Sequence, residues 1–362
     1  MLNHKLSEAH QQGQALRHHS THCLPPGAVT GIGSLPFRDP HTAVQWVAQT
    51  CPHIPFWPEL PRHSPHARSV EQTFNVFTDL VRPCRTGSRY EVMPGQLAAL
   101  LERLEQAPTR LEPTRSAGFF AFEQAMTAGL FAHAVAVKGQ LIGPLTLAWQ
   151  LSAEGIPLVT QPVYRAAIGR YLGRLAHWQI DRLAQWGKPV LFFVDEPCLG
   201  LVPSPSETTQ EELVAVLHDL LAALRRPGVL VGVHTCARLV SGGVALGAIR
   251  QARPDIIAFD AYQGLEVFCA DPIAQDFLRT GGWVAWGLVP TWPRLDQLDP
   301  QALFARWLRA ATGVMPVEAV ARQTLITATC GLGLLPEPAV ASSFHLAHQL
   351  AQRIAQVAQA PA

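Results

Sequence analysis

Short apolar runs alternate with longer amphipathic stretches from residue 28 onward, a pattern typical of βα units around a parallel sheet. Eight apolar runs are predicted as strands: Ala28–Gly33, Ile54–Trp57, Val135–Ile142, Val190–Val194, Val229–Val233, Ile256–Phe259, Trp283–Leu288 and Leu325–Ala328. Eight strands alternating with helices predict an α/β fold of the (β/α)8 TIM-barrel type, in one domain over residues 28–362.

Capping and spacing signals predict several of the intervening helices. Asp39-Pro40 supplies an N-cap and a proline at the first helical position, and Thr208-x-x-Glu211 has the spacing of a capping box. Together with the helical apolar spacing, these signals predict helices over Thr42–Thr50, Pro162–Trp186, Glu212–Arg226 and Pro338–Val357.

The second and third predicted strands are much farther apart than the other neighbours in the series. A structureless loop of that length would be unusual in a compact domain, so we expect an inserted subdomain at about residues 60–133. Its expected elements are Val70–Val81, a hairpin near Tyr90–Pro94, and helices at Gln96–Gln106 and Phe122–His133. The insertion is expected over one end of the barrel, either as a lid or as a decoration without a role in binding.

Residues 1–27 differ from the rest of the chain. They are polar, contain five of the fifteen histidines and lack the apolar core of a signal peptide, so a flexible polar N-terminal arm is predicted. His18, His19, His22 and Cys23 could be taken for a metal site, but in a flexible arm we expect them to be solvated side chains.

Composition excludes several classes of function. The net charge is +1 and only 15% of residues are charged, which gives no electrostatic case for binding nucleic acid or an anionic membrane surface. Hydrophobic residues reach 48%, but no apolar run is long enough to predict a membrane span. The seven cysteines are too sparse for a disulfide scaffold, so a reducing, cytoplasmic location is expected.

Polar side chains follow six of the eight predicted strands. They are Ser34, Glu59, the pair Asp195 and Glu196, the pair His234 and Cys236, Asp260, and Cys330. In (β/α)8 barrels the chemistry is located at the carboxyl ends of the strands. The sequence therefore predicts an active site at this end of the barrel.

Four of these residues predict a metal site. His234 and Cys236 are two residues apart in an extended segment, so their side chains leave the same face and can converge on one ion. Asp260 and Cys330 at two other strand ends would complete a tetrahedral set of nitrogen, sulfur and oxygen donors, which suits zinc. The alternative is that both cysteines are ordinary buried residues and His234 is a hydrogen-bonded core histidine.

The ordered set of motifs resembles the C-terminal catalytic barrel of the cobalamin-independent methionine synthase family, within the superfamily that shares the fold of uroporphyrinogen decarboxylase. The resemblance covers about residues 28–350. It rests on the segments Gly31–Ser34, Ile142–Trp149, Val194–Pro197, His234–Cys236, Asp255–Asp260 and Cys330–Leu332.

The resemblance implies roles for individual residues. His234, Cys236 and Cys330 match the catalytic zinc ligands, and Asp260 stands where the family has a glutamate ligand. The substrate residues matched are Ser34 and Asp195 for the amino-acid part of homocysteine, Glu59 for its amine, and Trp149 for stacking on the pterin of the methyl donor. Asp195 and Glu196 are the candidate catalytic acids.

The resulting hypothesis is a zinc-dependent methyltransferase that acts on a small-molecule thiol, most simply homocysteine to give methionine. A thiol with a pKa near 8.5 is mostly protonated at neutral pH, and zinc binding removes that proton. The donor is either methyltetrahydrofolate or a methyl-corrinoid such as methylcobalamin, presented by a partner corrinoid protein. The segment Trp286–Thr291 lacks the histidine that the family places there to protonate the folate nitrogen, which favours the corrinoid.

Two other readings remain open. Methyl could be transferred to another thiol, such as a coenzyme M-like sulfonate, although basic residues would then be expected in place of Asp195 and Glu59. Alternatively, the chain could be a non-catalytic zinc- or corrinoid-binding barrel, for which Asp260 in place of glutamate is the best support. A porphyrinogen-type decarboxylase is disfavoured, because that chemistry needs no cysteines at strand ends.

Overall fold

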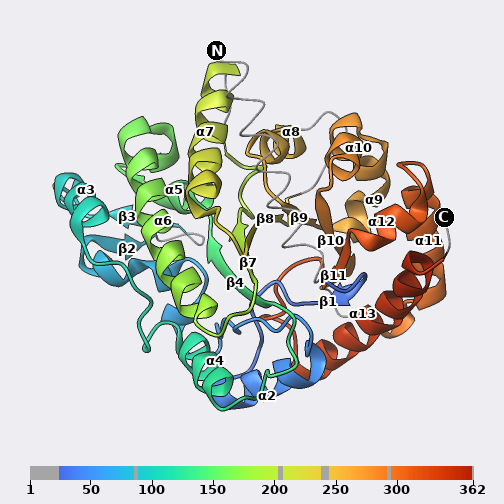
Figure 1. The fold of residues 1–362 in the computed structure, drawn as a ribbon. Coiled ribbons are helices and arrows are strands. Elements are labelled where there is room, and N and C mark those ends of the chain that lie inside the picture. The colour runs from blue at the N-terminus through green and yellow to red at the C-terminus, as the bar shows by residue number, and fades with distance from the viewer. Residues whose placement is uncertain (1–23, 85–88, 203–206, 238–243, 292–294, 361–362) are drawn as a thin grey trace.

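A parallel sheet curls through the middle of the molecule, with helices around its outer side (Figure 1). The computed structural model describes residues 24–84, 89–202, 207–237, 244–291 and 295–360. Residues 1–23 of the predicted arm, which include His18, His19, His22 and Cys23, lie outside the described residues. The last four residues of the predicted arm are described and pack on the sheet, because Leu24 is buried and Gly27 N–H donates to the Thr324 carbonyl at 2.7 Å. The strand order is β1-β11-β10-β9-β8-β7-β4. These strands are β1 (Ala28–Val29), β4 (Val137–Ile142), β7 (Val190–Asp195), β8 (Val229–Thr235), β9 (Ile256–Phe259), β10 (Trp283–Val289) and β11 (Thr324–Ala328).

The second predicted strand, Ile54–Trp57, does not form a regular β-strand, although it contacts both edges of the sheet. Phe56 and Lys138 form an isolated parallel bridge on the β4 side, and Ser34 and Glu59 form another on the side that follows β1. Pro55 and Pro58 lack the N–H donors that a regular ladder requires, which explains why only single bridges form here. The fold is therefore α/β with a curled seven-stranded parallel sheet.

Side-chain alternation along the strands separates an inner face from a face that packs on helices. A distinct buried cluster combines residues from all eight predicted strands: Ala28, Ile54, Ala136, Leu191, Phe193, Leu230, Ile256, Ala258, Trp283, Ala285 and Leu325. The intervening positions, such as Val190, Phe192 and Val194 in β7, belong to the larger core against the helices. Since side chains two apart share a face, Asp195 and His234 continue the inner face toward the carboxyl ends of the strands.

Close packing near the first predicted strand requires glycine. A Cβ on Gly31 would overlap the ring of Phe56, and one on Gly33 would lie 2.9 Å from Nε2 of Gln140. The backbone of the first strand therefore approaches its neighbours too closely for a side chain, and only Ala28–Val29 forms a regular ladder with β11.

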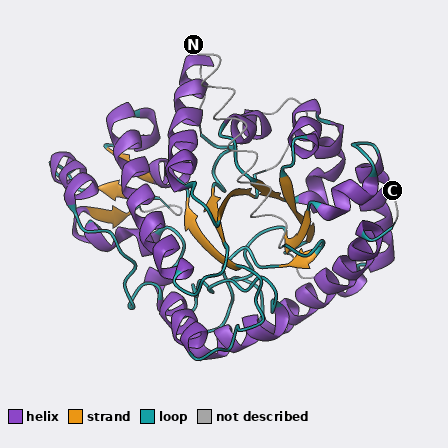
Figure 2. Cartoon of the chain, viewed as in Figure 1, coloured by secondary structure: helices purple, strands orange, loops and turns teal. Residues whose placement is uncertain are grey.

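The helices flanking the sheet are α2 (Pro40–Thr50), α4 (Ala117–Thr127), α5 (Pro144–Gln150), α6 (Pro162–Ala184), α7 (Glu207–Leu224), α8 (Val244–Gln251), α9 (Ala261–Ala270), α10 (Pro272–Arg279), α11 (Pro300–Thr312), α12 (Val317–Arg322) and α13 (Glu337–Ala358) (Figure 2). Three of them, α2, α10 and α11, start with the same Asp-Pro pair, whose carboxylate caps a backbone N–H. The predicted capping box is wrong, because α7 begins at Glu207 and includes Thr208 in its first turn.

A second, smaller sheet lies beside the main one, with strand order β2-β3-β5-β6. Its strands are β2 (Val81–Pro83), β3 (Tyr90–Val92), β5 (Leu151–Ala153) and β6 (Ile156–Pro157), and α3 (Leu97–Gln106) follows β3. β2 and β3 pair as an antiparallel hairpin, while β3 pairs in parallel with β5, which comes after α5. The predicted element at Val70–Val81 consists instead of two 3-10 helices, Glu71–Val76 and Thr78–Leu80, and the helix expected at Phe122–His133 is α4, which ends at Thr127.

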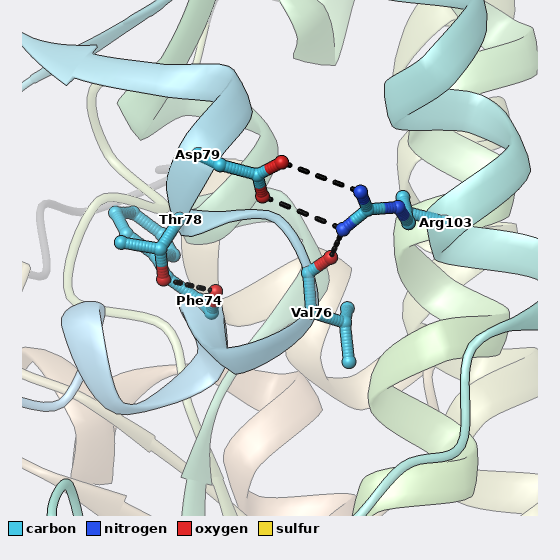
Figure 3. A network of polar contacts seen from close by, with 5 residues as sticks. All are labelled: Phe74, Val76, Thr78, Asp79 and Arg103. Carbon is cyan, nitrogen blue, oxygen red and sulfur yellow. Dashed lines mark hydrogen bonds and ion pairs between the residues drawn. The ribbon is translucent and has the colours of Figure 1, made fainter.

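Figure 3 shows how α3 is attached to these 3-10 turns. The Arg103 guanidinium donates to the carbonyl of Val76 at 2.8 Å and to the two carboxylate oxygens of Asp79 at 3.3 and 3.4 Å. Thr78 donates its hydroxyl to the Phe74 carbonyl at 2.6 Å within the turn. Among the described residues, no helix has the length and apolar character needed to cross a bilayer.

Candidate metal centre

One histidine and two cysteines converge at the carboxyl ends of β8 and β11. His234 is in β8, Cys236 follows it by two residues, and Cys330 comes two residues after the end of β11. One ligand atom from each of the three lies within 4.8 Å of the others, and no other group of three or more such ligand residues occurs in the part of the chain that the structure describes. The side chains that the sequence placed at two distant strand ends are thus within reach of a single ion.

The chemistry of this group fits zinc. Both ring nitrogens of His234 are buried without a hydrogen-bond partner, which is costly unless a ligand binds one of them. The pKa of the Cys330 thiol is lowered, chiefly because Cys236 donates a hydrogen bond to its sulfur and also because His234 lies beside it. The pKa of Cys236 is raised by the same shared proton and by burial. One imidazole nitrogen and two sulfurs are a ligand set that zinc accepts, with a fourth position for another donor.

Asp260 does not join this group. It is the N-cap of α9, where Oδ1 accepts from the backbone N–H of Gln263 at 3.0 Å and Oδ2 accepts from its side-chain amide at 2.8 Å. Asp260 does follow directly after β9, as predicted, but its carboxylate caps α9 and is not part of the group formed by His234, Cys236 and Cys330.

Two buried carboxyl groups lie near the three ligands. Burial raises the pKa of Asp195 to about 6, opposed by His234 and Lys138, and its Oδ1 has no hydrogen-bond partner. Burial, together with the nearby charge of Asp195, raises the pKa of Glu59 to about 8, although Gln72 donates to Glu59 Oε1 at 2.7 Å. Cys330 contributes to both shifts, which places these two acids in the electrostatic environment of the thiol group.

Lys138 is a buried cation that the motif search missed. It is 1% exposed, and its Nζ donates to the carbonyl of Ile32 at 2.6 Å and to Gln140 at 3.1 Å. Burial lowers its pKa to about 8 against the attraction of Asp195 and Glu59. Its position in a predicted buried strand was the available signal, because a lysine on the inner face of a strand requires acidic or carbonyl partners.

Ser34 lies next to the loop that carries Cys330. Its backbone carbonyl accepts from Leu332 N–H at 2.9 Å, and its hydroxyl accepts from Gly333 N–H at 3.3 Å. A Cβ on Gly331 would overlap the Ser34 hydroxyl, so this serine and the cysteine loop are in close contact. The backbone of Ser34 also forms an isolated parallel β-bridge with that of Glu59, so these two predicted substrate residues lie side by side in the site.

Glu196, predicted as a catalytic acid, is buried against the start of α5. Its carboxylate accepts from the backbone N–H groups of Leu145 at 2.9 Å and Thr146 at 2.7 Å, and from the Thr146 hydroxyl at 2.6 Å. These donors belong to the first turn of α5, so Glu196 caps that helix from the neighbouring strand. Both of its oxygens accept hydrogen bonds in this way, so Glu196 holds the start of α5 against the end of β7.

Trp149, near the end of α5, packs against a cation. The guanidinium of Arg89 lies over the indole ring, with 4.6 Å between Cζ and the ring centroid. One face of the ring that was expected to stack on a pterin is therefore covered by an arginine, which no motif in the sequence singled out.

Comparison with known proteins supports the fold. No protein-family model and no curated protein matches this sequence. Among solved structures, the chain is similar to a B12-independent methionine synthase from a Shewanella species, solved in complex with selenomethionine, with a TM-score of 0.59 and 13% identity over 92% of this chain and 98% of that one. It is also similar to a Listeria monocytogenes protein whose assignment as a vitamin-B12-independent methionine synthase is provisional, with a TM-score of 0.56 and 13% identity over 89% and 87% of the two chains. At this identity the likeness shows that the chain shares their fold.

Proposed function

We propose that this protein is a zinc-dependent methyltransferase that moves a methyl group to the thiol of an amino-acid substrate, most simply homocysteine to give methionine. The observation that carries the proposal is the convergence of His234, Cys236 and Cys330 beside two buried carboxyl groups. The similarity to methionine synthase structures supports the same reaction class. In this proposal the curled sheet, together with the segment at residues 54–59, acts as a complete (β/α)8 barrel.

His234, Cys236 and Cys330 would hold the zinc ion. Zinc bound by them would ionise a substrate thiol at neutral pH and so supply a sulfur nucleophile. Two cysteines in the ligand set donate more charge to the ion than neutral ligands would, which keeps a bound sulfur reactive toward an electrophilic methyl group. His234 is buried near the end of β8, with neither ring nitrogen used in a hydrogen bond, so a nitrogen is free to bind the ion.

The carboxyl groups select the substrate. The unpartnered Oδ1 of Asp195 is an acceptor for a substrate ammonium, and Asp195 lies close enough to Glu59 to raise the pKa of its carboxyl group. An ammonium placed between them stabilises their ionised forms and lowers the pKa of both. Ser34, bridged to Glu59 and in contact with the Cys330 loop, is placed to orient the amino-acid part of that substrate. A sulfonate-bearing thiol is disfavoured, because its negative charge would face these acids.

The proposed donor is a methylated reduced folate. Both similar structures are described as B12-independent, which gives no support to the methyl-corrinoid donor favoured by the missing histidine. The thiol site lies at the carboxyl ends of the strands. The donor would therefore approach from that end of the sheet, where α5 and the smaller sheet follow β4.

The test is methionine formation by zinc-loaded protein given homocysteine and either methyltetrahydrofolate or methylcobalamin. We expect product from the folate, with loss of at least a hundredfold in rate for Cys330→Ala. Cys269→Ala, which removes a buried thiol on α9 away from the three ligands, is the matched control and should retain activity. Turnover with methylcobalamin alone would overturn the donor assignment, and equal activity in both cysteine variants would overturn the proposed centre.

A further inference from the structure

Two polar side chains on the inner face of β4 bind the segment at residues 54–59 where regular strand pairing stops. Lys138 and Gln140 are two residues apart in β4, so their side chains leave the same face of the sheet, and both are fully buried. In the described part of the chain, backbone pairing between this segment and β4 ends with a long bond of 3.4 Å from Trp57 N–H to the Lys138 carbonyl. The Trp57 carbonyl accepts from the side-chain amide of Gln140, at 3.0 Å from Nε2.

Lys138 extends this link to the chain that follows β1. Its ammonium donates to the Ile32 carbonyl at 2.6 Å and to Oε1 of Gln140 at 3.1 Å. An unbroken set of hydrogen bonds therefore runs from Ile32 through Lys138 and Gln140 to Trp57. A buried carbonyl that loses its donor is left unsatisfied, so both carbonyls are held firmly by this pair of side chains.

Each of the two bound carbonyls lies two residues before a predicted substrate residue. Ile32 precedes Ser34, and Trp57 precedes Glu59. The same side chains thus fix the backbone on both sides of the corner where Ser34 and Glu59 form their β-bridge.

The corner itself is held by two backbone hydrogen bonds. Glu59 N–H donates to the Gly33 carbonyl at 3.0 Å, and Leu35 N–H donates to the Glu59 carbonyl at 2.9 Å. Gly33 packs directly on the side-chain amide of Gln140, because a Cβ there would lie 2.9 Å from Nε2. A change at Gln140 therefore acts first on the position of Glu59.

The charge of Lys138 acts on the two acids of the site. Its ammonium is attracted by Asp195 and Glu59, which offsets part of the cost of its burial. Nζ also lies 4.9 Å from the ring centroid of Phe193, two residues before Asp195 on the same face of β7. One cation beside two acids leaves a single negative charge uncompensated when both acids are ionised, which matches one substrate ammonium.

We propose that Lys138 and Gln140 are positioning residues for the amino-acid end of the substrate. They act through Ser34 and Glu59 and do not touch the thiol, so they set the preference for a thiol that carries an amino-acid group over one that does not. The inference rests on the proposed function for the identity of the substrate, whereas the effect of the pair on the corner can be measured without turnover.

Hydrogen exchange measures the effect on the corner. Gln140→Met keeps the length of the side chain but loses the donor to Trp57, and we expect the amides of Glu59 and Leu35 to exchange about tenfold faster than in the wild type. Gln179→Met is the matched control, because Gln179 is a fully buried glutamine of α6 whose side-chain nitrogen and oxygen have no hydrogen-bond partner. It should leave both amides unchanged.

Calorimetric titration of the zinc-loaded protein measures the effect on the substrate. Homocysteine should bind Gln140→Met about tenfold more weakly than the wild type, while 2-mercaptoethanol, a thiol without an amino-acid end, should bind both equally. Zinc content should not change, because Lys138 still holds Ile32 in this variant. If methionine is formed, the KM for homocysteine should rise about tenfold with kcat little changed.

A second variant guards against unfolding. Gln140→Glu keeps an acceptor for Lys138 but, once ionised, has no donor for the Trp57 carbonyl, so the same losses are expected. A thermal melt of each variant checks that the fold is intact.

The outcomes separate this inference from the proposed function. Unchanged exchange of the Glu59 and Leu35 amides, or an equal loss of affinity for homocysteine and 2-mercaptoethanol, would overturn the inference even if methionine is formed. Loss of zinc from Gln140→Met would also overturn it, because the pair would then support the metal centre. Weaker homocysteine binding by Gln140→Met, in a protein whose wild type binds homocysteine but forms no methionine, would retain the inference and refute the function.

Discussion

Replacing Glu59 by glutamine tests two effects of this buried acid: how much it lowers the stability of the folded protein near neutral pH, and how much it contributes to substrate binding. Glu59 is 6% exposed, and glutamine keeps the shape and an oxygen that can accept from Gln72 while removing the ionisable group. The pKa rises from 4.5 to about 8 in the folded protein, chiefly through burial. The folded protein therefore retains a proton that the unfolded chain releases as the pH rises through 4.5.

The sign and size of the effect follow from that difference. An acid whose folded pKa is raised contributes fully to stability below its unfolded pKa, and that contribution is lost as the pH rises toward the folded pKa. At about 1.4 kcal/mol per pH unit, the wild type loses about 3 kcal/mol between pH 4.5 and about pH 7 that Glu59→Gln does not lose. We therefore expect similar stabilities near pH 4.5 and a variant more stable by about 3 kcal/mol near neutrality.

Urea unfolding of the metal-free protein at a series of pH values measures this difference. Glu102→Gln, at an exposed position of α3, is the control and should show no pH-dependent gain. The same Glu59 variant should bind homocysteine at least tenfold more weakly in the zinc-loaded protein, because the ammonium loses an acid. A stability difference that stays constant with pH, or a variant that is less stable at neutral pH, would refute the reasoning.

Three further substitutions test other contacts of the site. Glu196→Ala leaves the donors of Leu145 and Thr146 without their acceptor and should lower the free energy of unfolding by about 2–4 kcal/mol in urea denaturation; an unchanged midpoint would contradict its capping role. Lys138→Met removes the buried cation that attracts Asp195 and Glu59 and should cost about 3 kcal/mol near pH 7, and no loss in the same assay would argue against that attraction. Gly331→Ala pushes on Ser34 and should weaken zinc binding about tenfold in a chelator competition, whereas wild-type affinity would show that the loop can yield.

Much of the framework was predictable from periodicity. Seven of the eight apolar runs form strands of the main sheet, because alternating and continuous apolar positions identify a sheet covered by helices. The run at Ile54–Trp57 is the exception, since Pro55 within it and Pro58 directly after it lack ladder donors, although the segment still contacts both edges. The capping box at Thr208 failed because a local motif cannot show that a helix starts earlier.

The site was predictable only in part. Positions at strand ends were sufficient to bring His234, Cys236 and Cys330 together, because parallel strands end at one edge of a sheet. The orientation of a side chain beyond the strand was not predictable: Asp260 caps a helix instead of joining the thiols, and Glu196, predicted as a catalytic acid, accepts hydrogen bonds from the start of α5. Arg89 lies in a segment whose placement depends on pairing between the two distant strands β3 and β5, which no local pattern in the sequence reports.

Metal content tests the central claim most directly. Protein prepared under reducing conditions with zinc supplied, then freed of excess metal, should contain about one zinc ion per chain. His234→Ala and Cys330→Ser should lose most of that zinc, while Asp260→Asn and Cys269→Ser should retain it. A wild type without zinc, or equal zinc content in the His234 and Cys269 variants, would contradict the proposed centre.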